Sequence, residues 1–183
     1  MILPSVINTS NINKQKEFKR LFAHYNHVID FVNTEVDEII ADPITVIVHK
    51  AISVGDTIFV EDTSLDVVGH NFGIAIKHKV NELINAIGCR AVWNVYMAFC
   101  QQDTVFIFKG SVSGVICHKT GESGFGFDPY FIPDGCTKTL AQEKLNQYNA
   151  RALCVDAIMN GNIFAVESAK ADFTQYMLQK NTI

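Results

Sequence analysis

Short apolar runs alternate with segments of helical period in the first third of the chain. Residues 2–9 and 28–32 predict short buried strands, because both are dense in large apolar side chains. Residues 14–22 lie between these strands and place apolar side chains at helical spacing, so they predict a helix. A second helix is expected to begin at Pro43 and to stop at Gly55. Strand, helix, strand, helix, strand is the order typical of an α/β protein.

The sequence predicts a candidate functional site at the end of the third strand of this series. Residues 58–60, Ile-Phe-Val, predict a buried strand, and Glu-Asp-Thr-Ser follows at 61–64. Open α/β sheets place their chemistry at strand ends, so we expect the strand to stop there and the chain to turn. Because adjacent side chains on a strand point to opposite faces, Glu61 and Asp62 share a metal or phosphate site only if it does stop. The alternative is that Asp62 and Thr63 merely cap the strand.

The second half of the chain has a less regular pattern. Residues 72–101 predict a mostly helical segment that Gly88 divides, with an aromatic stripe typical of a core or dimer surface. The other elements expected are two strands at 104–109 and 111–118, on either side of Gly110, and two closing helices at 150–160 and 166–179.

Residues 121–135 form the most unusual stretch. The glycines and prolines of Gly-Glu-Ser-Gly-Phe-Gly-Phe-Asp-Pro-Tyr-Phe-Ile-Pro-Asp-Gly exclude regular structure, yet the stretch carries aromatic side chains that a solvated linker would not need. A rigid, ordered loop that presents aromatic rings is suited to stacking a nucleobase.

Composition excludes several classes of protein. With 183 residues, 48% apolar and 19% charged, the chain fits one domain or two small lobes sharing a core. Fifteen basic and nineteen acidic residues give a net charge of −4, which argues against a nucleic-acid partner. Five scattered cysteines without a Cys-x-x-Cys pair indicate neither a disulfide framework nor a zinc cluster, and favour a reducing compartment. No leader or membrane-spanning run is evident, so we expect a cytoplasmic protein without a membrane partner.

The turn before the first predicted helix is suited to phosphate. Free N–H groups at a helix start attract anions, and Lys14 adds a positive charge in the first turn, where the helix dipole favours an anion. A bound polyphosphate would resolve that conflict. The alternative is a solvated lysine on a capped helix.

Four separated segments resemble the inosine triphosphate pyrophosphatase family, whose members remove deaminated purine nucleotides. The family motifs are an opening T-x-N-x-x-K turn, a strand-end E-D-[ST]-x-L, an F-G-[YW]-D-P loop and the segment after that loop. Their counterparts here are Thr9-Ser10-Asn11-Ile12-Asn13-Lys14, Val60-Glu61-Asp62-Thr63-Ser64-Leu65, Phe125-Gly126-Phe127-Asp128-Pro129 and Phe131-Ile132-Pro133-Asp134-Gly135. Order and spacing match across about residues 5–158.

The resemblance implies an elongated α/β fold with a mixed sheet, in which residues 1–183 form one domain of two lobes around a central nucleotide cleft. It also implies a homodimer and Mg²⁺-dependent hydrolysis of nucleoside triphosphates, chiefly the inosine and xanthosine (deoxy)triphosphates, to monophosphate and pyrophosphate. Asp62 and Lys14 would be catalytic, and the candidate metal ligands are Asp62, Glu61 and Asp42. The candidate substrate-binding residues are Thr9, Ser10, Asn11, Lys14, Lys50 and Thr63 toward the phosphates, and Phe125, Gly126, Phe127, Asp128, Lys144, Tyr148, Asn149 and Arg151 toward the base and sugar.

The sequence departs from the family pattern on the metal side. The position of the family's second metal-binding glutamate holds Thr45, and Asp42, one helical turn earlier, could take its place. Thr45 could also hold the metal through water, since Mg²⁺ tends to keep several waters. Another departure is at residues 72–77, which keep only the glycine and a basic residue of the family segment.

The sequence also departs on the base side, where the family's Ser-His-Arg reads the 6-keto group of the purine. Lys144, Tyr148, Asn149 and Arg151 stand in this region instead. Arginine only donates, so an Arg151 reader predicts preference for inosine and xanthosine triphosphates over ATP. Asn149 can donate or accept and predicts that ATP is accepted nearly as well, and a third alternative is that Arg151 is a solvated surface residue. Two rival functions remain open. One is a pyrophosphatase with altered or relaxed base specificity. The other is a nucleotide-binding protein that lost turnover because threonine stands at position 45 in place of the metal-binding glutamate.

Overall fold

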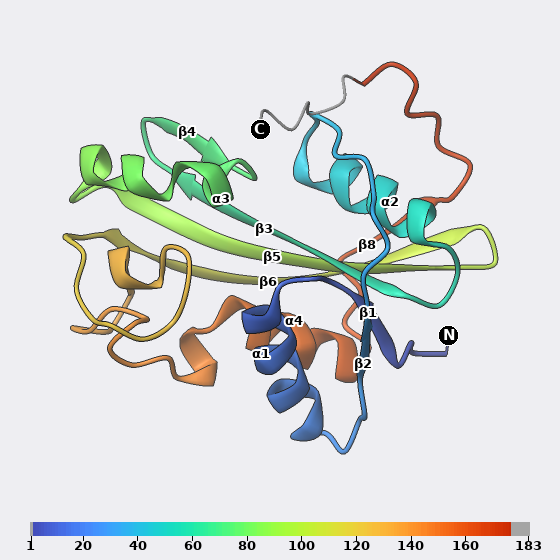
Figure 1. The fold of residues 1–183 in the computed structure, drawn as a ribbon, viewed down its shortest axis with the longest axis horizontal. Coiled ribbons are helices and arrows are strands. Elements are labelled where there is room, and N and C mark those ends of the chain that lie inside the picture. The colour runs from blue at the N-terminus through green and yellow to red at the C-terminus, as the bar shows by residue number, and fades with distance from the viewer. Residues whose placement is uncertain (1, 177–183) are drawn as a thin grey trace. The chain divides into compact units, whose positions relative to one another are not determined.

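The computed structural model describes residues 2–176 of the chain (Figure 1). Its strands are β1 (Val6–Asn8), β2 (Asp30–Val32), β3 (Phe59–Val67), β4 (His70–Gly73), β5 (Arg90–Gln101), β6 (Thr104–Ile116), β7 (Phe131–Pro133) and β8 (Ala165–Ser168). Its helices are α1 (Ile12–Ala23), α2 (Pro43–Val54), α3 (Ile76–Lys79) and α4 (Ala150–Met159), with 3₁₀ turns η1 (Val80–Ala86), η2 (Asp128–Tyr130) and η3 (Asn146–Tyr148).

The fold is α/β, and its strands form one mixed sheet of parallel and antiparallel pairs. The strand order is β2-β1-β3-β5-β6-β7, with β4 paired to β3 and β8 paired to β6. β1 runs parallel to both neighbours, so that Ile7 lies opposite Phe31 on one side and Phe59 on the other. Two parallel crossovers, through α1 and α2, therefore build the first part of the sheet, as the sequence predicted.

The chain divides into two compact units. The first unit contains the chain up to Asp62, Tyr96–Lys109 and the chain from Val155 onward, and the second contains Thr63–Val95 and Gly110–Cys154. Strands β3, β5 and β6 and helix α4 each contribute residues to both units.

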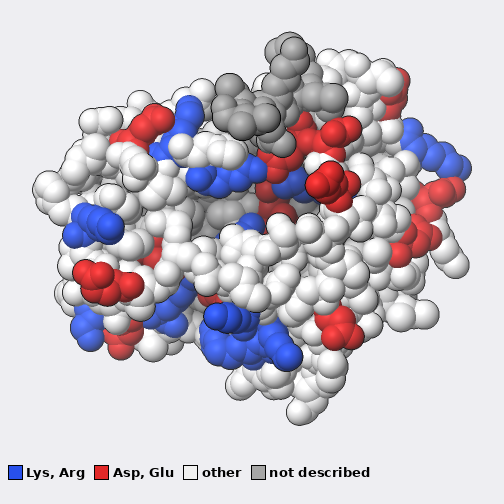
Figure 2. Space-filling view, viewed as in Figure 1, with Lys and Arg blue, Asp and Glu red and all other residues white. Residues whose placement is uncertain are grey.

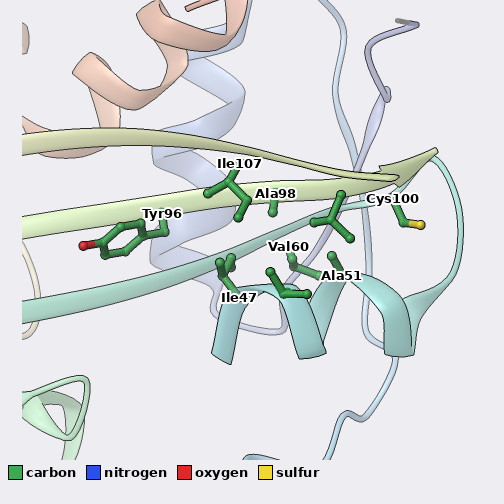
Figure 3. Packing of buried hydrophobic residues seen from close by; sticks show 9 residues of the cluster. Ile47, Ala51, Val60, Tyr96, Ala98, Cys100 and Ile107 are labelled. Atoms are coloured by element: carbon green, nitrogen blue, oxygen red, sulfur yellow. The ribbon is translucent and has the colours of Figure 1, made fainter. Parts of the chain in front are cut away.

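Helix α2 packs its apolar stripe on one face of the sheet in the first unit. Ile47 and Ala51 have no exposed surface and pack with Val60, Ala98 and Ile107 (Figure 3). Burying a side chain such as Ile47 contributes about 1.5–3 kcal/mol, which outweighs the modest helix propensity of a β-branched sequence. Hydrophobic packing thus sets which side of α2 meets the sheet.

Helix α1 covers the opposite face. Phe22 is fully buried, and its ring centroid lies 6.0 Å from that of Phe59. Phe59 and Val60 are neighbours on β3, so their side chains point to opposite faces. Figure 1 shows α1 and α2 on opposite sides of the strands accordingly.

Strand β3 does not end at Glu61 and Asp62, as the sequence predicted, but continues to Val67. The side chains of Glu61 and Asp62 therefore leave opposite faces of an unbroken strand. The prediction of a strand cap at Asp62 and Thr63 is wrong for the same reason.

Three further predictions of secondary structure are wrong. Residues 90–101 form strand β5 instead of a helix, although residues 76–86 do contain helical turns. Residues 104–116 form a single strand, β6, instead of two strands separated at Gly110. Residues 165–168 form strand β8 where a closing helix was expected at 166–179, and the end of that predicted helix lies outside the described residues.

Gly110 is required where β6 passes beneath α4. A Cβ atom at Gly110 would lie 2.0 Å from the carbonyl oxygen of Ala150 and 2.5 Å from the nitrogen of Cys154. The glycine is therefore a point of close backbone approach in the middle of a strand.

The described residues contain no helix that is both long enough and apolar enough to cross a membrane. Figure 2 shows lysine and arginine interspersed with aspartate and glutamate on the visible face. A continuous basic surface of the kind that binds nucleic acid is not seen on that face.

Candidate functional site

The turn between β1 and α1 has the geometry that the sequence predicted. The Asn11 side chain accepts hydrogen bonds from the backbone nitrogens of Asn13 and Lys14, at 3.0 and 3.3 Å, and so caps α1. The hydroxyl of Thr9 accepts from the nitrogen of Asn11 at 3.3 Å, while Ser10 is exposed. Thr9, Ser10 and Asn11 thus lie together at the positive end of a helix, where an anion is favoured.

Lys14 extends from the first turn of α1 to the sheet. Its ammonium group forms a short ion pair with Glu61, whose side chain is only 1% exposed. The alternative of a solvated lysine at this position is therefore wrong. The pair places a cation on the α1 face of β3, because Glu61 and Phe59 point to the same side of the strand.

Lys50 and Asp62 form the matching pair on the α2 face. The Lys50 ammonium donates to the Asp62 carboxylate at 2.7 Å, and both side chains are 16% exposed. Burial, the largest single influence, would lower the pKa of Lys50, but the charge and hydrogen bond of Asp62, with smaller contributions from other carboxylates, together raise that pKa above its usual value. Glu38 and Glu61 act in the same direction. The result is a carboxylate–ammonium pair that keeps a solvent-accessible edge.

Asp42 is the N-cap of α2. Its carboxylate accepts from the nitrogens of Ile44 and Thr45, at 3.0 and 3.1 Å, and from the Thr45 hydroxyl at 2.5 Å. Burial alone would raise the pKa of Asp42, but these hydrogen bonds hold it below its usual value, so the side chain stays ionised. Asp42 and Thr45 are thus direct partners one helical turn apart.

A second group of charged side chains lies in the second unit, around Phe125. Arg151 is 4% exposed, and its guanidinium donates to the Thr63 hydroxyl at 3.1 Å. Its guanidinium carbon lies 4.9 Å from the centroid of the Phe125 ring, within the range of a cation–π interaction. The alternative of a solvated Arg151 is wrong.

Lys144 and Asp128 complete this group. The Lys144 ammonium pairs with the Asp128 carboxylate at 3.0 Å and lies 4.9 Å from the centroid of the Phe125 ring. Asp128 also accepts from the Phe125 nitrogen at 3.0 Å, which fixes the loop. Gly126, which follows Phe125, is exposed and has a left-handed φ of +62°. The glycine- and proline-rich segment is therefore an ordered loop, as predicted.

Trp93 is a member of this group that sequence reasoning missed. It comes from β5, which was predicted to be helical, and it belongs to the aromatic stripe that was expected in a core or dimer surface. Its ring centroid lies 5.2 Å from the Lys144 nitrogen and 5.5 Å from the guanidinium carbon of Arg151. Phe127, predicted to contact the base, packs edge-on against Trp93 at 5.7 Å and is 7% exposed. We call Trp93, Phe125, Asp128, Lys144 and Arg151 the aromatic–cation cluster.

Tyr148 and Asn149 have other surroundings than the aromatic–cation cluster, although both were candidates for contacting the base. Asn149 is fully buried, and its amide oxygen accepts from the nitrogens of Arg151 and Ala152, at 2.9 and 3.4 Å, which caps α4. An amide fixed in this way cannot turn over to suit two different bases. Tyr148 lines a cavity of about 430 Å³, together with Lys138, that includes no member of the cluster.

The local chemistry differs between the two units. In the first unit, the positive end of the α1 dipole and two lysines suit the binding of anionic oxygens, and the side chain of Asp62 can act as a proton acceptor. In the second unit, an aromatic ring flanked by a buried arginine and a half-buried lysine suits a flat, polar ring bearing acceptor atoms. Asp62 and Thr63, whose hydroxyl accepts a hydrogen bond from Arg151, are consecutive in the sequence.

Comparison with known proteins agrees with this chemistry. Residues 5–161 match the Ham1 family. A relative named dITP/XTP pyrophosphatase, from Pyrobaculum aerophilum, is 32% identical over 164 residues, which cover 79% of this chain and 88% of the relative. A relative named inosine triphosphate pyrophosphatase, from Batrachochytrium dendrobatidis, is 29% identical over 155 residues, 75% of this chain and 80% of the relative.

A solved structure supports the fold. The crystal structure of a nucleoside-triphosphatase, also named dITP/XTP pyrophosphatase, from Mycobacterium abscessus superposes with a TM-score of 0.57 at 18% identity. The match covers 85% of this chain and 92% of that chain. The family that the motifs resemble is confirmed, and the chain belongs to the Ham1 family.

Proposed function

We propose that this chain is a magnesium-dependent nucleoside triphosphate pyrophosphatase that hydrolyses the inosine and xanthosine (deoxy)triphosphates to a monophosphate and pyrophosphate. The names of its relatives support the reaction type, since they are hydrolases of nucleoside triphosphates. The residues of the first unit support a phosphate site, and the aromatic–cation cluster supports a base site.

The observation that carries the proposal is the pairing of Asp62 with Lys50, in the same unit as the turn at Asn11 and Lys14. Anhydride hydrolysis needs a group that takes a proton from water and cations that stabilise the departing pyrophosphate. Asp62 supplies the first, and Lys14 and Lys50 supply the second.

The residues present fit a magnesium ion that is held largely by its substrate. Mg²⁺ is commonly bound by one or two carboxylates together with phosphate oxygens and waters. Among residues 2–176 there is no group of three histidine, cysteine or acidic side chains that could hold a metal by itself. Asp62 would hold the ion, with Asp42 as a second carboxylate, and the ion would neutralise charge on the phosphate oxygens.

The hydrolytic step follows from these roles. Asp62 orients a water molecule and accepts its proton while the water oxygen bonds to the α-phosphorus. The bond from that phosphorus to the α,β-bridging oxygen breaks, and its electron pair leaves with pyrophosphate. The positive end of the α1 dipole and the ammonium of Lys14 stabilise the departing oxygens.

The test is pyrophosphate release from a panel of ITP, XTP, GTP and ATP, each with and without Mg²⁺. The proposal predicts release that needs Mg²⁺ and is faster with ITP and XTP than with GTP or ATP. Similar rates for all four substrates would indicate relaxed base specificity. Binding of these nucleotides without any release would indicate a nucleotide-binding protein and would refute the proposed activity.

A further inference from the structure

Trp93 is the sole tryptophan of the chain, and its side chain is fully buried in β5. Its indole Nε1–H has no hydrogen-bond partner within the described residues. A buried donor without an acceptor costs free energy, because it has given up its hydrogen bond to water. Such a group in a native fold points to an acceptor that arrives with a ligand.

The surroundings of Trp93 are rich in donors. The ring lies within 5.5 Å of both the Lys144 nitrogen and the Arg151 guanidinium carbon. Phe125 lies 4.9 Å from the same two groups, so two aromatic rings flank two cations. The carboxylate of Asp128 in this cluster already accepts from Lys144 and from the Phe125 nitrogen. A ligand that contributes acceptor atoms therefore suits this environment better than one that contributes donors.

Purine bases differ in the number of acceptor oxygens that they offer. Xanthine carries two carbonyl oxygens, hypoxanthine carries one, and adenine carries an amino group instead. Arg151 only donates, and so does the indole of Trp93. A base with two carbonyl oxygens can accept from both residues at once, whereas hypoxanthine, with one carbonyl oxygen, leaves the indole N–H of Trp93 without an acceptor.

We propose that Trp93 is a specificity-determining residue whose indole N–H donates to the second carbonyl oxygen of a xanthine base, while Arg151 donates to the first. This inference rests on the proposed function and extends it, because it orders the substrates as XTP over ITP over ATP. The buried indole N–H of Trp93, which has no acceptor within the described residues, would thereby favour xanthine over the other purine bases.

Steady-state kinetics with the variant Trp93→Phe test the assignment, because phenylalanine keeps an aromatic ring and removes the N–H. The ratio of kcat/KM for XTP to that for ITP falls about tenfold, the size expected for one lost hydrogen bond to the substrate. The ratio for ITP to ATP, which depends on Arg151, stays within about twofold. An unchanged ratio of XTP to ITP in a folded Trp93→Phe protein would overturn the assignment.

Phe131→Leu is the matched control. Phe131 is fully buried in β7, and its ring centroid lies 6.2 Å from that of Phe127. This change also reduces a buried aromatic in the second unit, but it removes no donor. It is expected to lower stability without changing the ratio of XTP to ITP. A fall in that ratio as large as the fall in Trp93→Phe would assign the effect to packing and overturn the proposal.

Fluorescence of the wild-type protein gives a test that needs neither turnover nor a variant. Because Trp93 is the sole tryptophan, its emission reports this position alone. Xanthosine monophosphate is expected to shift the emission at saturation, inosine monophosphate to shift it less and adenosine monophosphate least. Occupancy is measured independently by equilibrium dialysis, and bound xanthosine monophosphate with unchanged emission would overturn the proposal.

The two tests separate this inference from the proposed function. If no triphosphate is cleaved but xanthosine monophosphate shifts the emission, the pyrophosphatase activity fails and the base contact stands. If the wild type cleaves XTP and ITP at equal rates and the emission does not respond, the activity stands and the role of Trp93 fails.

Discussion

Lys50 and Asp62 show how one ion pair can prepare a site for chemistry. The raised pKa of Lys50 keeps its ammonium charged through the neutral range, and this charge is lost only when the pH rises through that pKa. A lysine whose pKa is raised by folding contributes its full stabilisation at every pH below the pKa that it has in the unfolded chain. The contribution of Lys50 to stability is therefore constant across the neutral range. Asp62 therefore faces its substrate beside a side chain that stays cationic through the neutral range.

Asp62→Asn removes the charge and proton-accepting capacity of this side chain and keeps its size. Turnover is expected to fall at least about 100-fold, as is typical for loss of a general base, with the fold unchanged by circular dichroism. Glu61→Gln is the neighbouring control and should do less harm, because Glu61 lies on the opposite face of β3 and pairs with Lys14. Near-full activity of Asp62→Asn would refute the role of Asp62.

Arg151 provides the second prediction at this scale. Because its guanidinium is buried and lies over Phe125, Arg151→Met keeps a long apolar side chain and removes the donors. The preference for ITP over ATP is expected to disappear, while slow cleavage of both triphosphates remains. Rates for both nucleotides in the wild type and the variant measure this, and an unchanged preference would clear Arg151 of a reading role.

At the scale of elements, sequence patterns predicted the helices better than the long strands. α1 and α2 were correctly predicted because each has a polar cap, Asn11 or Asp42, and an apolar stripe on one side. Strand β5 was missed because nearly all of its residues are buried, which removes the alternation that identifies a strand. The adjacent charges of Glu61 and Asp62 predicted the end of a strand. The strand continues through them because Lys14 and Lys50, from α1 and α2, neutralise these charges.

The N-terminus of α2 tests whether Asp42 takes the place of the missing glutamate. Asp42→Asn keeps a good capping residue and removes the charge, so helix stability should hardly change. If Asp42 helps to hold the metal, this variant needs more Mg²⁺ for half-maximal activity, and Thr45→Glu is neutral or needs less. Magnesium titrations that are the same for wild type and both variants would show that the ion is held elsewhere.

The crossing of β6 and α4 gives a prediction on stability. In Gly110→Ala the new methyl group would meet the Ala150 carbonyl oxygen, and separation of α4 from the strand should cost about 1–3 kcal/mol or more. Urea denaturation measures the loss. Ser113→Ala, at an exposed position of the same strand, is the control and should remain within about 0.5 kcal/mol of wild type. Equal stability of the two variants would contradict the close approach.

At the scale of the whole molecule, family membership and the mixed α/β sheet could be predicted because the motifs are local in sequence. The phosphate turn and the loop at 121–135 each keep their residues within a few positions of one another. The position of Trp93 could not be predicted, since only the pairing of β5 in the sheet brings it to Phe125 and Arg151. The homodimer and the role of magnesium implied by the resemblance remain predictions.

The most direct test of the account identifies the products formed from ITP in the presence of Mg²⁺ by phosphorus NMR. Inosine monophosphate and pyrophosphate are expected in equal amounts from the wild type, and both should form at least about 100-fold more slowly with Asp62→Asn. Inosine diphosphate with orthophosphate, or no cleavage of bound ITP, would contradict this expectation.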